Sequence, residues 1–193
     1  MSKNILTFLF LLLSLNSCMP VFRITGEIKK PRHESINSIK RGLATSDSVG
    51  DALFVAKSFD NLKLAYKVNK YIPAIHIYDK RGRVLKKLEG NSCPKVASAS
   101  IEYVDTSSSL VFLEDAGFET LFSNLKQISG QEYSLNRTNL ENYDYIIVYF
   151  WARYIPKRSK KAIQSIALAM KETKSKFLVL SVNYDYQDFW LKE

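Results

Sequence analysis

Few side chains in this sequence offer redox or metal chemistry. The 193 residues include two cysteines, Cys18 and Cys93, and two histidines, His33 and His76. Two cysteines form at most one disulfide, which excludes four-cysteine zinc sites and cysteine-ligated iron–sulfur clusters. Two histidines also argue against a histidine-rich metal site. We therefore expect neither a metal nor a cofactor.

Cys93 is the candidate for thiol chemistry. It lies in the sequence NSCP at residues 91–94, directly before a predicted helix. A thiol at the start of a helix can become a reactive thiolate, and this favours thiol exchange as one interpretation. The alternative is a buried, inert thiol, since the chain offers no resolving cysteine. His76 alternates with Ile75 and Ile77, which favours a half-exposed strand histidine over a catalytic base or ligand.

Positive charge is the main compositional feature. Lysine and arginine number 28 against 19 acidic residues, a formal charge of +9. The densest cluster follows a predicted strand and occupies the start of a predicted helix, where it opposes the helix dipole. It indicates either an anion-binding or acidic-partner surface or a solvated helix face. Its members are Arg153, Lys157, Arg158, Lys160 and Lys161.

The elements that must position these residues follow from hydrophobic periodicity and turn signals. We expect helices over residues 34–44, 62–68 (capped by Asp60), 94–103, 118–128 and 156–173. We expect strands over residues 21–25, 52–56, 74–78, 83–85, 110–113, 146–151 and 177–182. Gly82 supplies the positive φ of the turn in the hairpin at 74–85. The last two strands and the helix between them form a βαβ unit within an α/β fold.

The amino terminus resembles the signal sequence of bacterial lipoproteins. An apolar run at residues 5–15 is too short to span a bilayer, and it ends in the sequence LNSC at residues 15–18, similar to a lipobox. The resemblance implies that residues 1–17 are removed as a signal peptide. It also implies that Cys18 is acylated with fatty-acid chains that include palmitate. Several acyl chains anchor a protein durably to a membrane. The residue after Cys18 is Met19 rather than Asp, and this favours the outer over the inner membrane.

Residues 133–188 resemble thioredoxin-like thiol-disulfide oxidoreductases. The strand YDYIIVYFWA at residues 143–152 is similar to the one before the active site of that family, and VNYD at residues 182–185 is similar to the end of its next strand. The family continues with an aromatic residue and then Cys-x-x-Cys at a helix start. Here Tyr154 matches the aromatic position, while Ile155 and Arg158 stand where the cysteines would be, with Pro156 between them. Redox activity is therefore not expected.

A second fragment resembles the region around the cis-proline of the same family. The sequence YKVNKYIP at residues 66–73 precedes the predicted hairpin, and Pro73 is the candidate cis-proline. The hairpin half precedes the strand-and-helix half, which is the reverse of the family's order. Two interpretations follow: two degenerate copies, or one rearranged domain in which the early hairpin completes the later sheet. The expected division is a first segment at 18–105, a linker at 106–109 and a second segment at 110–193.

The sequence thus predicts a thioredoxin-like α/β fold with a central mixed sheet and flanking helices. Three functions compete. The first is a lipid-anchored, non-enzymatic cell-envelope protein that binds a protein or peptide over residues 154–158 and Pro73. The second is thiol exchange through Cys93, and the third is a structural lipoprotein. An exported protein of this kind has no expected nucleic-acid partner.

Overall fold

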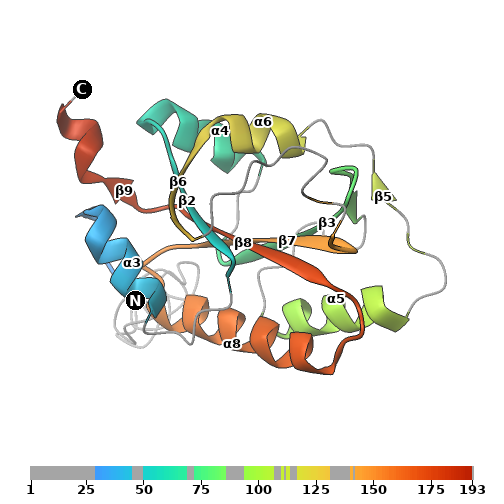
Figure 1. The fold of residues 1–193 in the computed structure, drawn as a ribbon. Helices are drawn as coiled ribbons and strands as arrows, with labels where there is room; N and C mark the ends of the chain where they lie inside the picture. Colours follow the sequence, from blue (N-terminus) through green and yellow to red (C-terminus); the bar gives the residue numbers. More distant parts are fainter. Residues whose placement is uncertain are drawn as a thin grey trace, which may run out of the picture.

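A mixed sheet lies at the centre of the fold (Figure 1). The computed structural model describes residues 29–44, 50–68, 72–85, 94–106, 110, 112–113, 117–130, 140 and 142–192. Within these residues the sheet has seven strands, in the order β5-β4-β3-β7-β8-β2-β6. Cys18, Cys93, the predicted strand at 21–25 and linker residues 107–109 lie outside the described residues.

The strands come from the whole length of the chain. Their bounds are β2 Ala52–Ala56, β3 Ala74–Asp79, β4 Val84–Leu85, β5 Phe112–Leu113, β6 Leu125–Gly130, β7 Tyr145–Trp151 and β8 Phe177–Asn183. β7 and β8 are parallel neighbours joined by a helix, as predicted for the βαβ unit. β8 also pairs in parallel with β2, while β3 pairs antiparallel with β7. A second, two-stranded sheet joins β1 (His33–Glu34) to β9 (Tyr186–Gln187).

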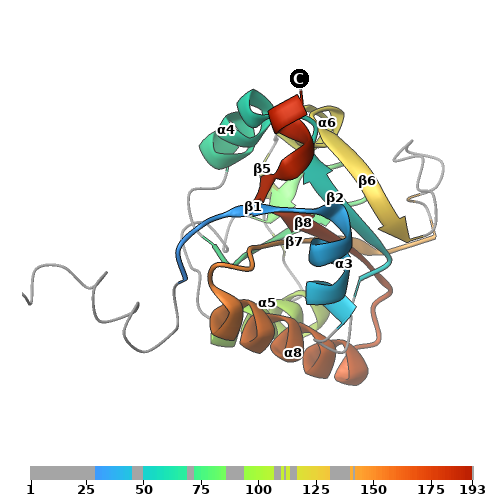
Figure 2. The same cartoon turned by 90° about the vertical axis from the view of Figure 1, so that its left-hand side faces the viewer.

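Helices cover both faces of the sheet (Figure 1). Their bounds are α3 Ile36–Ala44, α4 Phe59–Val68, α5 Pro94–Thr106, α6 Gly117–Ser123 and α8 Pro156–Glu172, followed at the end by the 3₁₀ turn η2 Asp188–Lys192. α4 and α6 lie over one face, and α5 and α8 over the other (Figure 1). α3 lies beside α8 on the latter side (Figure 2).

The two faces hold two separate hydrophobic clusters, since alternate residues of each strand point to opposite sides. Ile146, Val148 and Phe150 of β7 pack in the cluster under α4 and α6. Ile147, Tyr149 and Trp151 pack in the other cluster with α5 and α8. β7 therefore presents apolar side chains to both faces, as the sequence predicts for a central parallel strand.

The predicted hairpin is confirmed. Gly82 has φ +78°, and the Asp79 carboxylate accepts hydrogen bonds of 2.9 Å from the backbone N–H groups of Arg81 and Arg83. The expected cap of the preceding helix is wrong. Ser58, not Asp60, accepts the 3.2 Å bond from the Asn61 N–H, and Asp60 lies inside the first turn.

The single helix predicted over residues 118–128 is also wrong. α6 ends at Ser123, and the chain turns at Asn124 into strand β6, which pairs antiparallel with β2. Leu125 and Ile128 pack in different clusters, on opposite faces of the sheet. The helical spacing of these residues arises by chance, and pairing with the open edge of β2 decides the structure instead.

The two segments on either side of residues 106–109 share one sheet. β3 lies in the first segment and pairs with β7 of the second over six residue pairs, from Ala74 with Phe150 to Asp79 with Tyr145. β2 of the first segment likewise pairs with β8 and β6. The pairing agrees with the interpretation as one rearranged domain. The observed fold is an α/β domain with a mixed sheet and flanking helices.

Candidate functional site

The turn from β7 into α8 is the candidate site, and its backbone is held by buried groups. Ser159 donates to the carbonyl oxygen of Ala152 at 3.1 Å, and its own carbonyl accepts from the buried Tyr149 hydroxyl at 2.7 Å. Pro156 opens the helix at its first position, where a missing N–H costs nothing. These bonds fix the place where the helix begins.

The residues at the expected cysteine positions have different surroundings. Ile155, at the helix N-cap, is only 4% exposed and belongs to the core cluster under α4 and α6. Arg158, in the first turn of α8, is partly exposed. Neither side chain can exchange a disulfide, so these two positions offer no thiol chemistry.

Pro73 lies beside this turn although it is far away in the sequence. The Ile72–Pro73 peptide bond is cis, as the resemblance implies. Strand β3 begins at the next residue, and Ala74 pairs with Phe150 near the end of β7. The structure therefore brings Pro73 to the same end of the strands as residues 154–158. We name this set, Pro73 with residues 154–158, the junction edge.

Tyrosines connect α4 to the junction edge. The Tyr66 hydroxyl lies 2.9 Å from the Tyr154 hydroxyl, and the Tyr184 hydroxyl donates to the carbonyl of Ala65 at 2.9 Å. The rings of Tyr66 and Tyr184 are 4.8 Å apart. Burial raises the pKa of Tyr154 and that of Tyr66 above the ordinary value, so both hydroxyls stay protonated at neutral pH.

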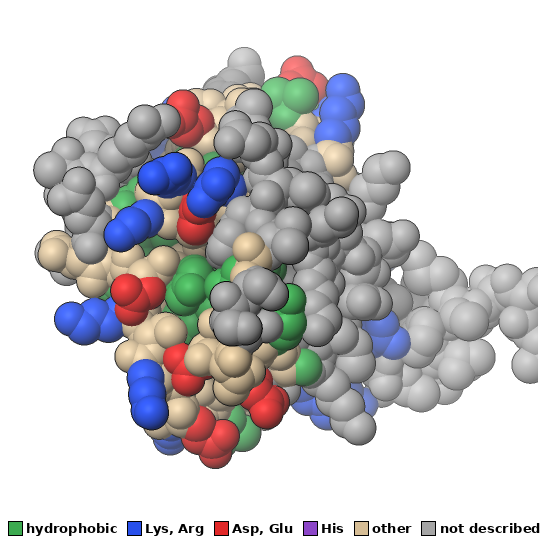
Figure 3. All heavy atoms as spheres, turned by 90° about the vertical axis from the view of Figure 1, so that its right-hand side faces the viewer, with side chains coloured by type: hydrophobic (Ala, Val, Ile, Leu, Met, Phe, Trp, Pro, Cys, Tyr) green, Lys and Arg blue, Asp and Glu red, His purple; other side chains and the backbone are tan. Residues whose placement is uncertain are grey.

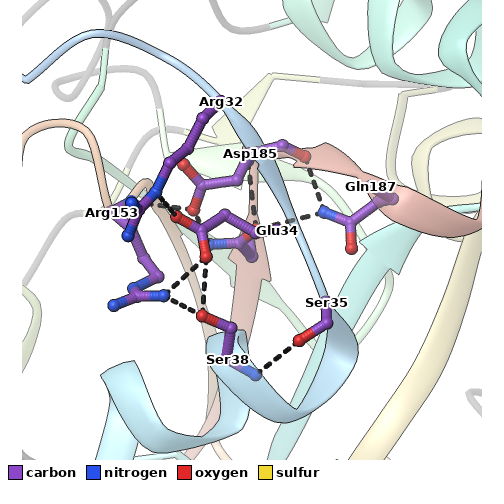
Figure 4. Close-up of polar contacts among 8 residues, drawn as sticks. Arg32, Glu34, Ser35, Ser38, Arg153, Asp185 and Gln187 are labelled. Carbon is purple, nitrogen blue, oxygen red and sulfur yellow. Dashed lines mark hydrogen bonds and ion pairs between the residues drawn. The ribbon is translucent and has the colours of Figure 1, made fainter.

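A partly buried polar cluster holds the other side of the turn, and we call it the Arg153 clasp (Figure 4). The Arg153 guanidinium contacts the Glu34 carboxylate at 2.6 Å and also donates to the Ser38 hydroxyl, which itself donates to Glu34 at 2.6 Å. Arg32 approaches the same carboxylate at 2.9 Å. The clasp thereby ties α3 and β1 to Arg153, two residues after the end of β7.

Electrostatics account for the charge state of Glu34. Burial acts to raise its pKa, but hydrogen bonds from Ser38 and Arg32 and the charge of Arg153 outweigh burial and lower the pKa below its ordinary value. Glu34 is therefore ionised at neutral pH. Its side chain is 6% exposed, so its charge depends on these partners.

Asp185 fastens the backbone of the same turn. Its Oδ2 accepts a 2.8 Å bond from the Arg153 N–H and a 2.7 Å bond from the Asn183 side-chain amide. The Asn183 Oδ1 in turn accepts from the Asp185 N–H at 3.0 Å, and Gln187 donates to the Asp185 carbonyl at 2.6 Å (Figure 4). Burial raises the pKa of Asp185, although the bond from Arg153 opposes that rise.

The VNYD sequence at residues 182–185 therefore has a structural role at the end of β8. Its polar side chains hold the β7–α8 turn against the next strand. The sequence drew attention to this motif only by resemblance. It gave no sign of Glu34, because the partner Arg153 lies 119 positions away.

The remaining sequence candidates are spread over the molecule. His76 is partly buried; its Nδ1 lies 3.2 Å from the Tyr78 hydroxyl and its ring packs at 5.1 Å on Phe150, so it is a strand histidine as predicted. Within the described residues no three His, Cys, Asp or Glu side chains form a metal-binding group. In the same residues no helix is long and apolar enough to cross a bilayer.

The basic cluster divides in two. Arg153 is committed to the clasp, whereas Lys157, Lys160 and Lys161 lie exposed along the start of α8. On the side of the molecule that faces right in Figure 1, acidic and basic side chains are interspersed (Figure 3). Comparison with known proteins adds no assignment: no family model, curated protein or solved structure matches this chain.

Proposed function

We propose that the chain is a lipid-anchored cell-envelope protein, held in the outer membrane through Cys18, with a redox-inactive thioredoxin-like fold. In this proposal the junction edge, residues 154–158 with Pro73, binds a protein or peptide partner. The lipobox-like sequence at residues 15–18 supports the anchor. A net positive charge suits a protein tethered beside anionic head groups.

The juxtaposition of Pro73 with the β7–α8 turn carries the proposal. Thioredoxin-like proteins place a cis-proline beside the helix start that holds their cysteines, and the pair shapes a groove for peptides. Here the two parts meet through the pairing of β3 with β7, although the chain visits them in the reverse order. The retained geometry, without a thiol at Ile155 or Arg158, favours binding over catalysis.

Accessible groups at the junction edge fit contact with a polypeptide. Tyr154, Pro156 and Arg158 are partly exposed, and Ile72 before the cis bond is as well. Tyrosine and arginine are typical of the residues that dominate protein interfaces. The clasp and the Ser159 bonds keep the backbone beneath them fixed, which lowers the entropy cost of binding.

Site-specific photo-crosslinking in the producing cell tests the binding surface. A photoreactive phenylalanine analogue replaces Arg158 in the full chain, and in a control it replaces Leu168, which is 63% exposed on the same helix. We expect a discrete adduct from position 158 that is absent from position 168. Identical adducts from both positions, or none from position 158, would refute the junction edge as the binding surface.

Mass spectrometry of the membrane fraction tests the anchor independently. We expect an amino-terminal peptide that begins at an acylated Cys18, and a Cys18→Ser variant that leaves the membrane fraction. An unmodified Cys18 thiol in the mature chain would contradict the anchor while leaving the binding surface to be judged by crosslinking.

A further inference from the structure

A pocket of about 190 Å³ opens between α3 and the start of α8, on the face of the sheet opposite α4 and α6. Apolar side chains of Trp151, Pro156 and Ile163 form part of its wall. Three cationic residues, Lys29, Arg153 and Lys160, also line it. We name it the α3–α8 pocket.

Two of the three cationic residues at this pocket have no acidic partner among the described residues. Arg153 has Glu34 as its partner, but Lys29 and Lys160 form no ion pair with any carboxylate in the part of the chain that the structure describes. The first turn of α8 holds no acidic residue and no side-chain cap. A helix N-terminus is itself positive, so lysines placed there lower stability unless an anion is present.

One residue of the pocket wall, Trp151, also carries an unsatisfied donor. Trp151 is 3% exposed, and its indole Nε1–H finds no acceptor within the described structure. A buried donor without a partner costs free energy, and natural proteins rarely retain one without a reason. Trp151 comes from β7 and Lys29 from the segment before β1, so separate parts of the chain line one cavity.

We propose that the α3–α8 pocket binds a phosphate group. A phosphate monoester carries a charge of about −1.5 to −2 at pH 7, which matches the two unpaired ammonium groups. The pocket volume equals that of about six waters at roughly 30 Å³ each, enough for a phosphate and a short substituent. A free phosphate ester and a phospholipid head group share this chemistry. The pocket lies next to the junction edge and shares Pro156 with it, but its cationic residues Lys29, Arg153 and Lys160 lie outside that set.

The tryptophan content makes the site directly observable. The chain has two tryptophans, so a Trp190→Phe background leaves one indole N–H signal, that of Trp151, in a ¹⁵N-labelled full chain. We expect inorganic phosphate to shift this signal saturably, with a dissociation constant on the order of 1 mM. Sodium chloride at equal ionic strength should give no saturable shift, and acetate should bind more weakly than phosphate.

Charge reversals locate the site. Lys160→Glu or Lys29→Glu should each weaken phosphate binding about tenfold, as expected for loss of one charge-assisted contact. Lys171→Glu makes the same charge change in the last turn of α8, and it should leave the dissociation constant within about twofold. All three lysines are exposed, so the variants should fold, which circular dichroism checks.

Three results would overturn the proposal: no saturable shift with phosphate, an equal affinity for acetate, or equal weakening by Lys171→Glu and Lys160→Glu. The source of the phosphate is a separate question with two supporting outcomes. If glycerol 3-phosphate binds with the same affinity as inorganic phosphate, the ligand is a free phosphate ester. Stronger sedimentation of the Lys171→Glu chain than of the Lys160→Glu chain with phosphatidic acid vesicles indicates a head group, since both chains share the same amino terminus.

Discussion

Removing the Arg153 charge should loosen the β7–α8 turn measurably. Arg153→Met keeps most of the apolar stem and deletes the guanidinium that contacts Glu34 at 2.6 Å. Breaking a buried ion pair costs about 3–5 kcal/mol when one charge is left alone. Here Glu34 keeps Arg32 and Ser38, and Arg153 itself is 30% exposed. We therefore expect a loss of about 2 kcal/mol in the free energy of unfolding.

Urea denaturation of the variants measures this loss. Lys161→Met is the matched control, because Lys161 lies exposed in the same helix and its replacement should cost less than about 0.5 kcal/mol. A double-mutant cycle with Glu34→Gln isolates the pair, with an expected coupling energy of about 1.5 kcal/mol. A coupling energy near zero, or an Arg153→Met cost no larger than the control, would refute the clasp as the element that fixes the turn.

The core and the carboxylates give two further predictions. Leu180→Ala, at a fully buried strand position, should lower the free energy of unfolding by about 3 kcal/mol. The control Leu168→Ala, on the exposed face of α8, should change it little. Equal effects of the two substitutions in thermal or urea unfolding would contradict the packing. In an NMR pH titration Asp105 should titrate with a pKa of about 2, because side-chain bonds from Thr173 and Ser175 stabilise its ionised form. Asp185 should titrate with a pKa above its ordinary value because of burial. Its contribution to stability is therefore present at low pH and declines as the pH rises through the raised pKa. The contribution of Asp105 is present above its ordinary pKa and is lost as the pH falls toward 2. An Asp185 pKa at or below the ordinary value would contradict its burial.

Local patterns in the sequence predict much of this fold. The apolar runs at residues 52–56 and 146–151 become β2 and β7, since a strand that is buried on both faces must be apolar throughout. Gly82 allows the positive φ of the hairpin turn, and Pro156 marks the first residue of α8. These signals are local, and they need no knowledge of the partner strand.

What the sequence cannot predict depends on distant partners. β6 has helical spacing and becomes a strand only because β2 offers it an edge. Glu34 looks like an ordinary charged residue until Arg153 and Ser38 surround it. That the two halves of the chain share one sheet likewise depends on the pairing of β3 with β7, which no periodicity encodes.

The most direct test of the central claim is the rate of thiol-dependent insulin reduction, measured on the native chain and on an Ile155→Cys/Arg158→Cys variant. Residues three apart at a helix start lie about 5–6 Å apart between Cβ atoms, close enough for a small adjustment to form a disulfide. We predict no turnover by the native chain and a gain of turnover in the double variant, because the thioredoxin-like geometry that we propose for the junction edge would then hold a pair of thiols. Turnover by the native chain that disappears in Cys93→Ser, or a double variant that forms no disulfide, would contradict the account.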